Sequence, residues 1–240
     1  MKSIAKLITY IIIGLVVIIV FGFLWASSPN YPHNEYSKLI TNSLDSKIKN
    51  DSTFSIITYN IGYLSGMTNN KAIKKPKQLF DSNLKKVKKE FELLNADIIA
   101  FQEIDYKSAR SYYINQQNEI VKLGYKYTAQ AINWDEKYVP FPYWPLYMHF
   151  GEILSGQSII SKYPLKDHQR IVLERVNESP FYRDALYLDR LAQVARVIIK
   201  NKSVVIINVH LEAFYKTTRI KQLDFVIDLF DKYNSKVFFN

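Results

Sequence analysis

The fold is decided by FSIITYNIGYL (54–64), QLFDSNLKKVKKEFELLN (78–95) and DIIAFQEI (97–104), which follow one another along the chain. The first and third stretches are short, apolar and rich in β-branched residues, as buried strands are. The middle stretch repeats its apolar residues at helical spacing, at Leu79, Leu84, Val87, Phe91 and Leu94. The sequence therefore predicts a β-α-β unit at the start of a folded domain.

Further elements extend this unit toward the C-terminus. Their patterns predict a helix over 112–123, strands over 125–133 and 157–165, a hairpin of 191–200 with 204–211 joined at Asn201-Lys202, a helix over 218–233 and a strand that begins at 236–239. Because hairpins alternate with β-α-β units, we expect a mixed sheet system flanked by helices, an α+β or α/β layered sandwich. The segment 133–152 combines three prolines with many aromatic residues, so we expect a long loop there that covers an active site.

Composition narrows the chemistry. The 240 residues are 48% hydrophobic and 22% charged, which excludes collagen-like and wholly disordered chains. The chain has no cysteine, so disulfides, thiol nucleophiles and cysteine-bound metals are excluded. The four histidines form no paired metal-binding motif. Any bound metal is therefore expected on oxygen ligands.

The N-terminus carries a candidate membrane anchor. Residues 7–26 contain no charge, and at 1.5 Å per residue they span about 30 Å, the thickness of the hydrocarbon core. Lys2 and Lys6 precede this segment, so the positive-inside rule predicts a single-pass protein with a cytoplasmic N-terminus and an extracytoplasmic domain. A cleaved signal peptide is the alternative, but its apolar core is usually about 7 to 15 residues long. We expect an anchor over 1–26, a flexible linker over 27–51 and one domain over 52–240.

Positive charge is concentrated in one region. The net charge is +10, and residues 71–89 hold eight lysines against the single acid Asp81. Such a region favours nucleic acid, anionic lipid or phosphorylated substrates. A solvated helix face is the alternative interpretation.

Three predicted strands end in polar residues. Strand alternation places Ile56, Thr58 and Asn60 on one face, Ile99, Phe101 and Glu103 on one face of the next strand, and Val204, Ile206, Asn208 and His210 on one face of a third. Ligands in such sheets gather beyond the carboxyl ends of strands. Asn60, Glu103 and His210 are therefore expected to converge.

At these residues the sequence resembles the endonuclease/exonuclease/phosphatase (DNase I-like) superfamily. The matching segments are TYNIGY (58–63), ADIIAFQEID (96–105), SGQSIISKYPL (155–165) and INVHLEAF (207–214), followed by Arg219 and Gln222. The resemblance implies a two-sheet, four-layer sandwich and the hydrolysis of phosphoesters with Mg²⁺ or Mn²⁺. It implies that Glu103 ligates the metal, that Asn60 and His210 are catalytic with Asn208 in support, and that Arg219 and Gln222 bind substrate.

Family members continue into a Gly-Asp-Phe-Asn motif and a later Asp-His pair, which this sequence lacks. We therefore expect a C-terminally truncated domain with weak activity or none.

The resemblance leaves two functions open. One is a membrane-anchored phosphodiesterase, phosphatase or nuclease acting on nucleic acid or on a lipid headgroup. The other is a non-catalytic, membrane-anchored module that binds anionic lipid, nucleic acid or a partner protein.

Overall fold

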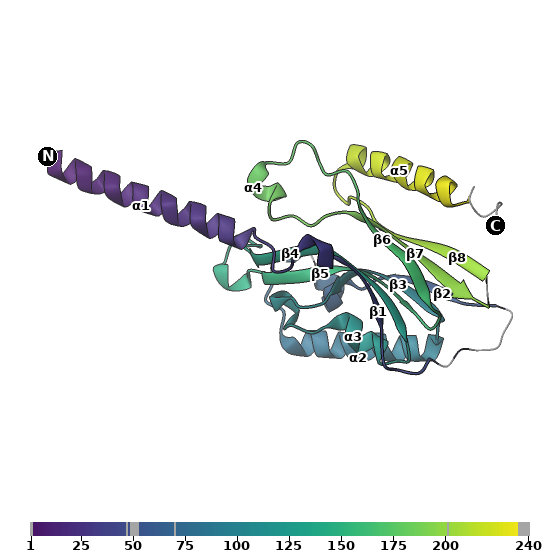
Figure 1. Ribbon diagram of the computed structural model, residues 1–240. Helices are drawn as coiled ribbons and strands as arrows, with labels where there is room; N and C mark the ends of the chain where they lie inside the picture. Colours follow the sequence, from purple (N-terminus) through teal and green to yellow (C-terminus); the bar gives the residue numbers. More distant parts are fainter. Residues whose placement is uncertain (1, 47, 49–52, 70, 201, 235–240) are drawn as a thin grey trace.

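Two β-sheets face each other, and helices cover the outer face of each (Figure 1). The computed structural model describes residues 2–46, 48, 53–69, 71–200 and 202–234. The helices are α1 (Lys2–Ala26), α2 (Lys77–Leu94), α3 (Gln116–Val121), α4 (Phe181–Asp184) and α5 (Lys216–Asn234). The strands are β1 (Ser37–Thr41), β2 (Ile56–Asn60), β3 (Ile98–Asp105), β4 (Tyr127–Val139), β5 (Gly151–Ser161), β6 (Leu165–Val172), β7 (Leu191–Ile199) and β8 (Lys202–His210).

The first sheet has five strands in the order β1-β4-β5-β3-β2, and the second has three in the order β6-β7-β8. Strands β2 and β3 are parallel, with Ile56 opposite Ile98, and α2 connects them. The predicted β-α-β unit is therefore confirmed, as is the β7–β8 hairpin, in which Leu191 lies opposite His210. The expected fold class, a mixed two-sheet sandwich flanked by helices, is also confirmed.

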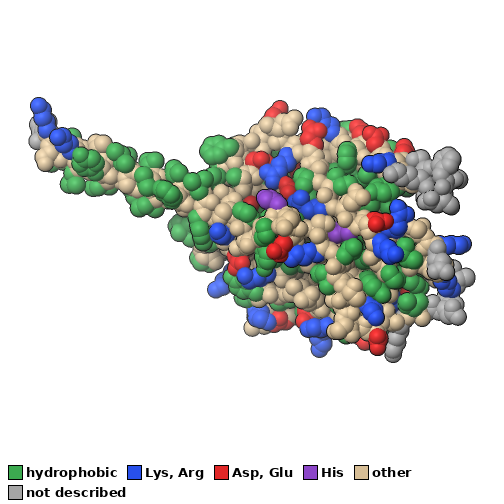
Figure 2. All heavy atoms as spheres, viewed as in Figure 1, with side chains coloured by type: hydrophobic (Ala, Val, Ile, Leu, Met, Phe, Trp, Pro, Cys, Tyr) green, Lys and Arg blue, Asp and Glu red, His purple; other side chains and the backbone are tan. Residues whose placement is uncertain are grey.

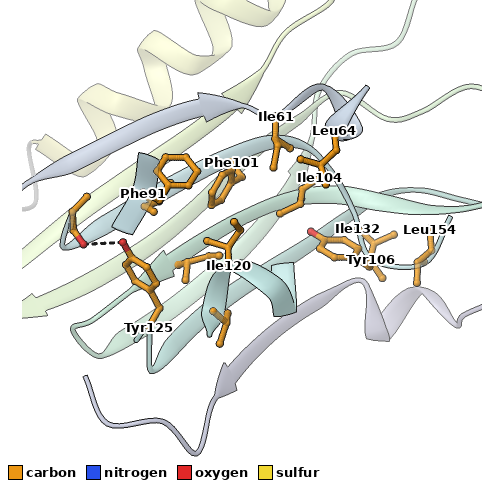
Figure 3. Packing of buried hydrophobic residues seen from close by; sticks show 14 of the residues in the cluster. Ile61, Leu64, Phe91, Phe101, Ile104, Tyr106, Ile120, Tyr125, Ile132 and Leu154 are labelled. Atoms are coloured by element: carbon orange, nitrogen blue, oxygen red, sulfur yellow. Dashed lines mark hydrogen bonds between the residues drawn. The ribbon is translucent and has the colours of Figure 1, made fainter. Parts of the chain in front are cut away.

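Three apolar clusters hold the layers together. The largest lies between α2, α3 and the five-stranded sheet and includes Phe91, Phe101 and Tyr125 (Figure 3). Tyr125 is almost fully buried, and its hydroxyl donates to the Ala96 carbonyl oxygen at 2.9 Å, so its polar atom is satisfied. A second cluster fills the space between the sheets, and a third lies between the three-stranded sheet and α5. The order of layers is therefore helix, sheet, sheet, helix.

The flexible linker expected over 27–51 is wrong for Ser37–Thr41. These residues form β1, which pairs antiparallel with β4, with Ser37 opposite Ala131. The preceding Tyr36 is buried in the largest apolar cluster. An edge strand such as β1 needs backbone hydrogen bonds more than apolar side chains, so the hydrophobic pattern did not reveal it.

The loop expected over 133–152 is also partly wrong, because β4 continues to Val139 and β5 begins at Gly151. An extra residue at Asn133 interrupts the pairing of β4 with β5. Such a bulge breaks the alternation of apolar and polar residues by which a strand is identified in sequence. Residues 140–150 remain a loop that contains the short helix Leu146–Met148.

Two other predicted elements differ in detail. The helix expected over 112–123 is shorter, covering Gln116–Val121. Helix α5 turns Thr218, Gln222 and Leu229 toward the protein, whereas its apolar stripe of Ile220, Leu223, Ile227 and Phe230 stays exposed. The strand expected at 236–239 lies outside the described residues.

Helix α1 projects from the sandwich, and apolar side chains lie along its visible surface beyond the lysines at its N-terminal tip (Figures 1 and 2). It is long and apolar enough to cross a membrane, which is a property of its length and composition only. Its C-terminal turn contacts the domain: the Trp25 ring lies 6.2 Å from that of Tyr138, and the Phe23 ring lies 6.1 Å from that of Phe181. The base of α1 is therefore packed against β4 and α4.

Candidate functional site

A β-bulge in β3 sets the direction of the Glu103 side chain. Gln102 and Glu103 together lie opposite the single residue Gln157 of β5, and Glu103 has a left-handed backbone with φ 53°. Regular alternation places Glu103 on the same face as Phe101, which packs on Phe91 of α2. The bulge turns Glu103 instead toward the second sheet, as bulges near functional sites commonly do. The alternation argued from sequence for this strand is therefore wrong at Glu103.

The structure nevertheless brings Asn60, Glu103 and His210 together. Glu103 Oε1 lies 3.4 Å from His210 Nε2, and the Asn60 side chain hydrogen-bonds the same carboxylate. Asn60 Oδ1 accepts the backbone N–H of Gly62 at 2.9 Å, which leaves its amide N–H₂ group for Glu103. Asn69, not identified from the sequence, donates from Nδ2 to Glu103 Oε2 at 2.6 Å. Strands from both sheets thus supply one site.

These contacts fix the charge of Glu103. Burial raises the pKa of this carboxyl group, but hydrogen bonds from His210, Asn60 and Asn69 outweigh burial and lower the pKa to about 2. A buried carboxylate is stable only where donors compensate its charge. Glu103 is therefore ionised throughout the neutral pH range.

Arg190 is a further member of the site that the sequence analysis missed. Its side chain is only 7% exposed, and its Nη1 donates to His210 Nε2 at 3.0 Å. Its other donors are held by Glu212 Oε2 at 3.3 Å and by the Tyr187 hydroxyl at 3.0 Å. The pairing of β7 with β8 sets Leu191 opposite His210, so the register of this hairpin was the signal that places Arg190 beside His210.

Two neighbours of His210 require opposite protonation states of its Nε2 atom. Nε2 accepts a hydrogen bond from Arg190, yet it must carry a proton to donate to Glu103. The other ring nitrogen, Nδ1, is buried without a hydrogen-bond partner among the described residues. An anion that accepts hydrogen bonds from both Arg190 and a protonated Nε2 removes this conflict. Arg190 and His210 could therefore both donate to one anionic group.

Asn208 lies beneath the site rather than in it. Its Nδ2 donates to the Phe101 carbonyl oxygen at 3.0 Å and to Gln193 Oε1 at 3.1 Å, and its Oδ1 accepts from Gln102 Nε2 at 2.5 Å. The hydrogen bonds to Phe101 and Gln102 of β3 cross the buried space between the two sheets, whereas the one to Gln193 lies within the second sheet. Asn208 thus links β8 to β3 and fixes the position of His210, which lies two residues further along β8.

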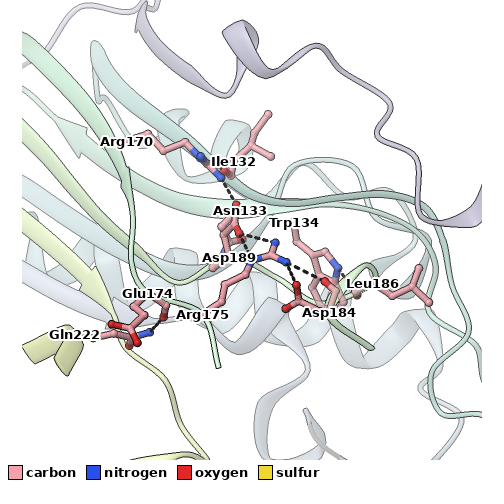
Figure 4. Close-up of polar contacts among 10 residues, drawn as sticks. All are labelled: Ile132, Asn133, Trp134, Arg170, Glu174, Arg175, Asp184, Leu186, Asp189 and Gln222. Atoms are coloured by element: carbon pink, nitrogen blue, oxygen red, sulfur yellow. Dashed lines mark hydrogen bonds and ion pairs between the residues drawn. The ribbon is translucent and has the colours of Figure 1, made fainter. Parts of the chain in front are cut away.

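Arg219 and Gln222 bind the protein's own backbone. Arg219 Nη1 donates to the carbonyl oxygens of Glu212 and Ala213 at 3.1 and 2.9 Å. Gln222 accepts the Glu212 N–H at 2.7 Å and donates to the Glu174 carbonyl oxygen at 2.7 Å (Figure 4). Both residues therefore hold the segment after β8, including Glu212, in place behind Arg190.

Glu103 is the one carboxylate among the side chains that meet at this site within the described residues. Among the described residues no group of three or more histidine, aspartate or glutamate side chains gathers in one place. Mg²⁺ is commonly held by one or two carboxylates, with water and substrate phosphate completing its shell. One ionised carboxylate beside an anion-accepting pair fits that pattern and also suits Mn²⁺.

No family model matches this chain, and no curated protein matches it. Solved structures of similar architecture include an endonuclease/exonuclease/phosphatase from Beutenbergia cavernae DSM 12333, with 17% identity, a TM-score of 0.49 and coverage of 73% of this chain and 43% of that chain. Another is ANGEL2, a 2′,3′-cyclic phosphatase, with 16% identity, a TM-score of 0.47 and coverage of 80% and 49%. A third is TDP2 from Caenorhabditis elegans, with 18% identity, a TM-score of 0.46 and coverage of 78% and 43%. The chain spans about half the length of these structures or less.

Proposed function

We propose that this protein hydrolyses phosphoester bonds at the site formed by Glu103, His210 and Arg190. The proposal is carried by the meeting of a buried, ionised carboxylate with two nitrogen donors at one edge of the sandwich. A phosphoryl group has oxygens for both donors and for a metal ion on the carboxylate.

Each side chain has a separate role in the proposed site. Arg190, locked by Glu212 and Tyr187, binds a non-bridging oxygen of the phosphoryl group, and His210 Nε2–H donates to the same group. Asn60 and Asn69 hold Glu103 in the orientation in which it binds Mg²⁺ or Mn²⁺. The ion, when bound, supplies a Lewis acid that stabilises charge on the phosphoryl and leaving oxygens. Asn208 acts as a positioning residue through His210.

The anchor and the site lie at the same end of the five-stranded sheet, which supports action at a membrane surface. Asp135 of β4 accepts the backbone N–H groups of Asn30 and Tyr31, just after α1, at 3.0 and 2.8 Å. The same stretch of β4 pairs with β5 at Leu154, and the next β5 residue pairs with Asp105 at the end of β3. If α1 spans a bilayer with its N-terminus in the cytoplasm, this end of the five-stranded sheet lies next to the extracytoplasmic surface of the membrane.

The test is metal-dependent hydrolysis of bis(p-nitrophenyl) phosphate by the full chain in detergent. We expect turnover that saturates with Mg²⁺ and falls at least about 100-fold in Glu103→Gln and in Arg190→Lys. The matched control is Glu92→Gln, which makes the same chemical change on the exposed face of α2 and leaves the rate unaltered. Equal turnover in wild type and Glu103→Gln contradicts the proposed site. No metal-dependent turnover in the wild type contradicts the proposed function and leaves the binding-module function in its place.

A further inference from the structure

A cleft of about 180 Å³ opens beside the proposed site. Its walls come from the segment before α2, from the turn after β3, and from the end of the loop before β5. Asn69 lines the cleft and also donates to Glu103 Oε2 at 2.6 Å. A ligand in the cleft is therefore separated from the catalytic carboxylate by one side chain.

The cleft is positively charged. Lys74, Lys75 and Arg110 line it, and its lining includes no aspartate or glutamate among the described residues. Arg110 is neutralised by Asp105, whose Oδ1 lies 2.8 Å from its Nη2, so the two lysines carry the net charge. Lys75 donates to the Lys71 carbonyl oxygen at 3.2 Å, and within the described part of the chain it has no carboxylate at ion-pair distance. Burial and the nearby charge of Arg110 lower the pKa of Lys75. An anion in the cleft would raise this pKa again.

The walls are partly aromatic. The Arg110 guanidinium lies 3.4 Å from the centroid of the Tyr63 ring, and its side chain is 7% exposed. The Tyr112 hydroxyl donates to the Lys75 carbonyl oxygen at 2.7 Å and so holds the backbone beneath that lysine. Tyr147 and Phe150 close the opposite side. The cleft thus has two lysine side chains on one wall and aromatic rings on the other.

We infer that this cleft binds a second anionic group of the substrate, so that the preferred substrate is a phosphoester carrying another phosphate next to the ester that is cut. This inference rests on the proposed function for the identity of the cut ester. Two sources share the chemistry: a soluble nucleoside bisphosphate, and a lipid headgroup region with two phosphates. Their common feature is a phosphate that reaches Lys74 and Lys75 while the ester lies at Glu103 and Arg190.

Binding is measured first, without turnover, by calorimetry on the full-length Glu103→Gln protein in detergent. We expect adenosine 3′,5′-bisphosphate to bind at least about 10-fold more tightly than adenosine 5′-monophosphate. In Lys74→Gln/Lys75→Gln this preference should disappear. In the control Lys85→Gln/Lys86→Gln, which removes the same charge from exposed positions of α2, it should persist. Loss of preference in both double variants, or in neither, overturns the inference.

A second arm separates the two sources. Cosedimentation with phosphatidylcholine vesicles containing cardiolipin, which has two phosphates, is compared with vesicles containing phosphatidylglycerol at equal charge. A cardiolipin preference that needs Lys74 and Lys75 assigns the cleft to lipid, and a preference confined to the bisphosphate nucleotide assigns it to a soluble ligand. If neither ligand is preferred, the cleft is not an anion subsite, even where phosphodiester hydrolysis is observed. If a preference is found without hydrolysis, the cleft stands and the proposed function falls.

Discussion

Glu103 and Glu136 are both largely buried carboxyl groups, yet their pKa values move in opposite directions. Glu103 has three side-chain donors and its pKa falls to about 2. Burial and the neighbouring charge of Asp135 raise the pKa of Glu136 to about 8. Its Oε2 atom has no hydrogen-bond partner among the described residues. Donors, rather than burial alone, decide which carboxyl group carries charge at neutral pH.

The raised pKa of Glu136 predicts a pH-dependent stability. A carboxyl group whose folded pKa lies above its unfolded value stabilises fully below pH 4.5 and loses that contribution as pH rises through about 8. We expect the free energy of unfolding to decline between pH 5 and pH 9 in the wild type and to decline less in Glu136→Gln. Urea denaturation at each pH measures this. If Glu136→Gln and the exposed control Glu90→Gln give the same profile, the buried neutral state of Glu136 is excluded.

At the scale of elements, paired bulges position the site. Gly156 of β5 lies where both the β3 and the β4 pairings shift register. A Cβ atom at this glycine would clash with the carbonyl oxygen of Ala131 on β4. Glycine inside a strand commonly marks such a close backbone approach. The bulge that turns Glu103 therefore depends on a residue of another strand.

Gly156→Ala should separate β4 from β5 and disturb the bulge beside it. We expect a loss of unfolding free energy of about 2 to 4 kcal/mol, together with a loss of any activity that depends on Glu103. Thermal denaturation checks the first effect and the phosphodiester assay the second. Gly22→Ala, at a position in α1 with no atom within 4 Å of the added Cβ, is the control. An unaltered melting temperature in Gly156→Ala contradicts this account of the bulge.

At the scale of the whole molecule, the base of α1 is fixed to the domain. Asp135 accepts from the backbone of Asn30 and Tyr31 and from the Tyr36 hydroxyl, and the Lys137 N–H donates to the Ser28 carbonyl oxygen at 3.1 Å. The loop at 140–150, in which Trp144 is 76% exposed, follows directly on β4. Exposed aromatic rings of this kind are typical of the interface between membrane and water.

We expect the full chain to remain with membranes through a carbonate wash, because the twenty uncharged residues of α1 are long and apolar enough to cross the hydrocarbon core. Protease added outside intact cells should reach the domain and spare the N-terminus, because Lys2 and Lys6 precede the helix and the positive-inside rule predicts a cytoplasmic N-terminus. A chain that begins at Ser27 should be lost from the membrane under the same wash and serves as the control. Release of the full chain by carbonate contradicts the anchor.

Local patterns in the sequence determined much of the fold. The helical spacing of 78–95 and the apolar runs at 97–104 and 204–211 fixed α2, β3 and β8, because one period of side chains suffices to bury one face of each element. The grouping of Asn60, Glu103 and His210 followed from polar residues at strand ends. The register of the β7–β8 hairpin also predicts that Arg190 lies beside His210, although the pattern of residue types did not indicate a role for Arg190.

What only the tertiary structure decided is how those side chains point and what surrounds them. The bulge at Glu103, the edge strand β1 and the extra residue in β4 arise from pairing between distant segments, which no local period encodes. The roles of Asn208, Arg219 and Gln222 likewise depended on which backbone groups folding brought within hydrogen-bond distance. Periodicity is a property of neighbours along the chain, whereas a site is a property of neighbours in space.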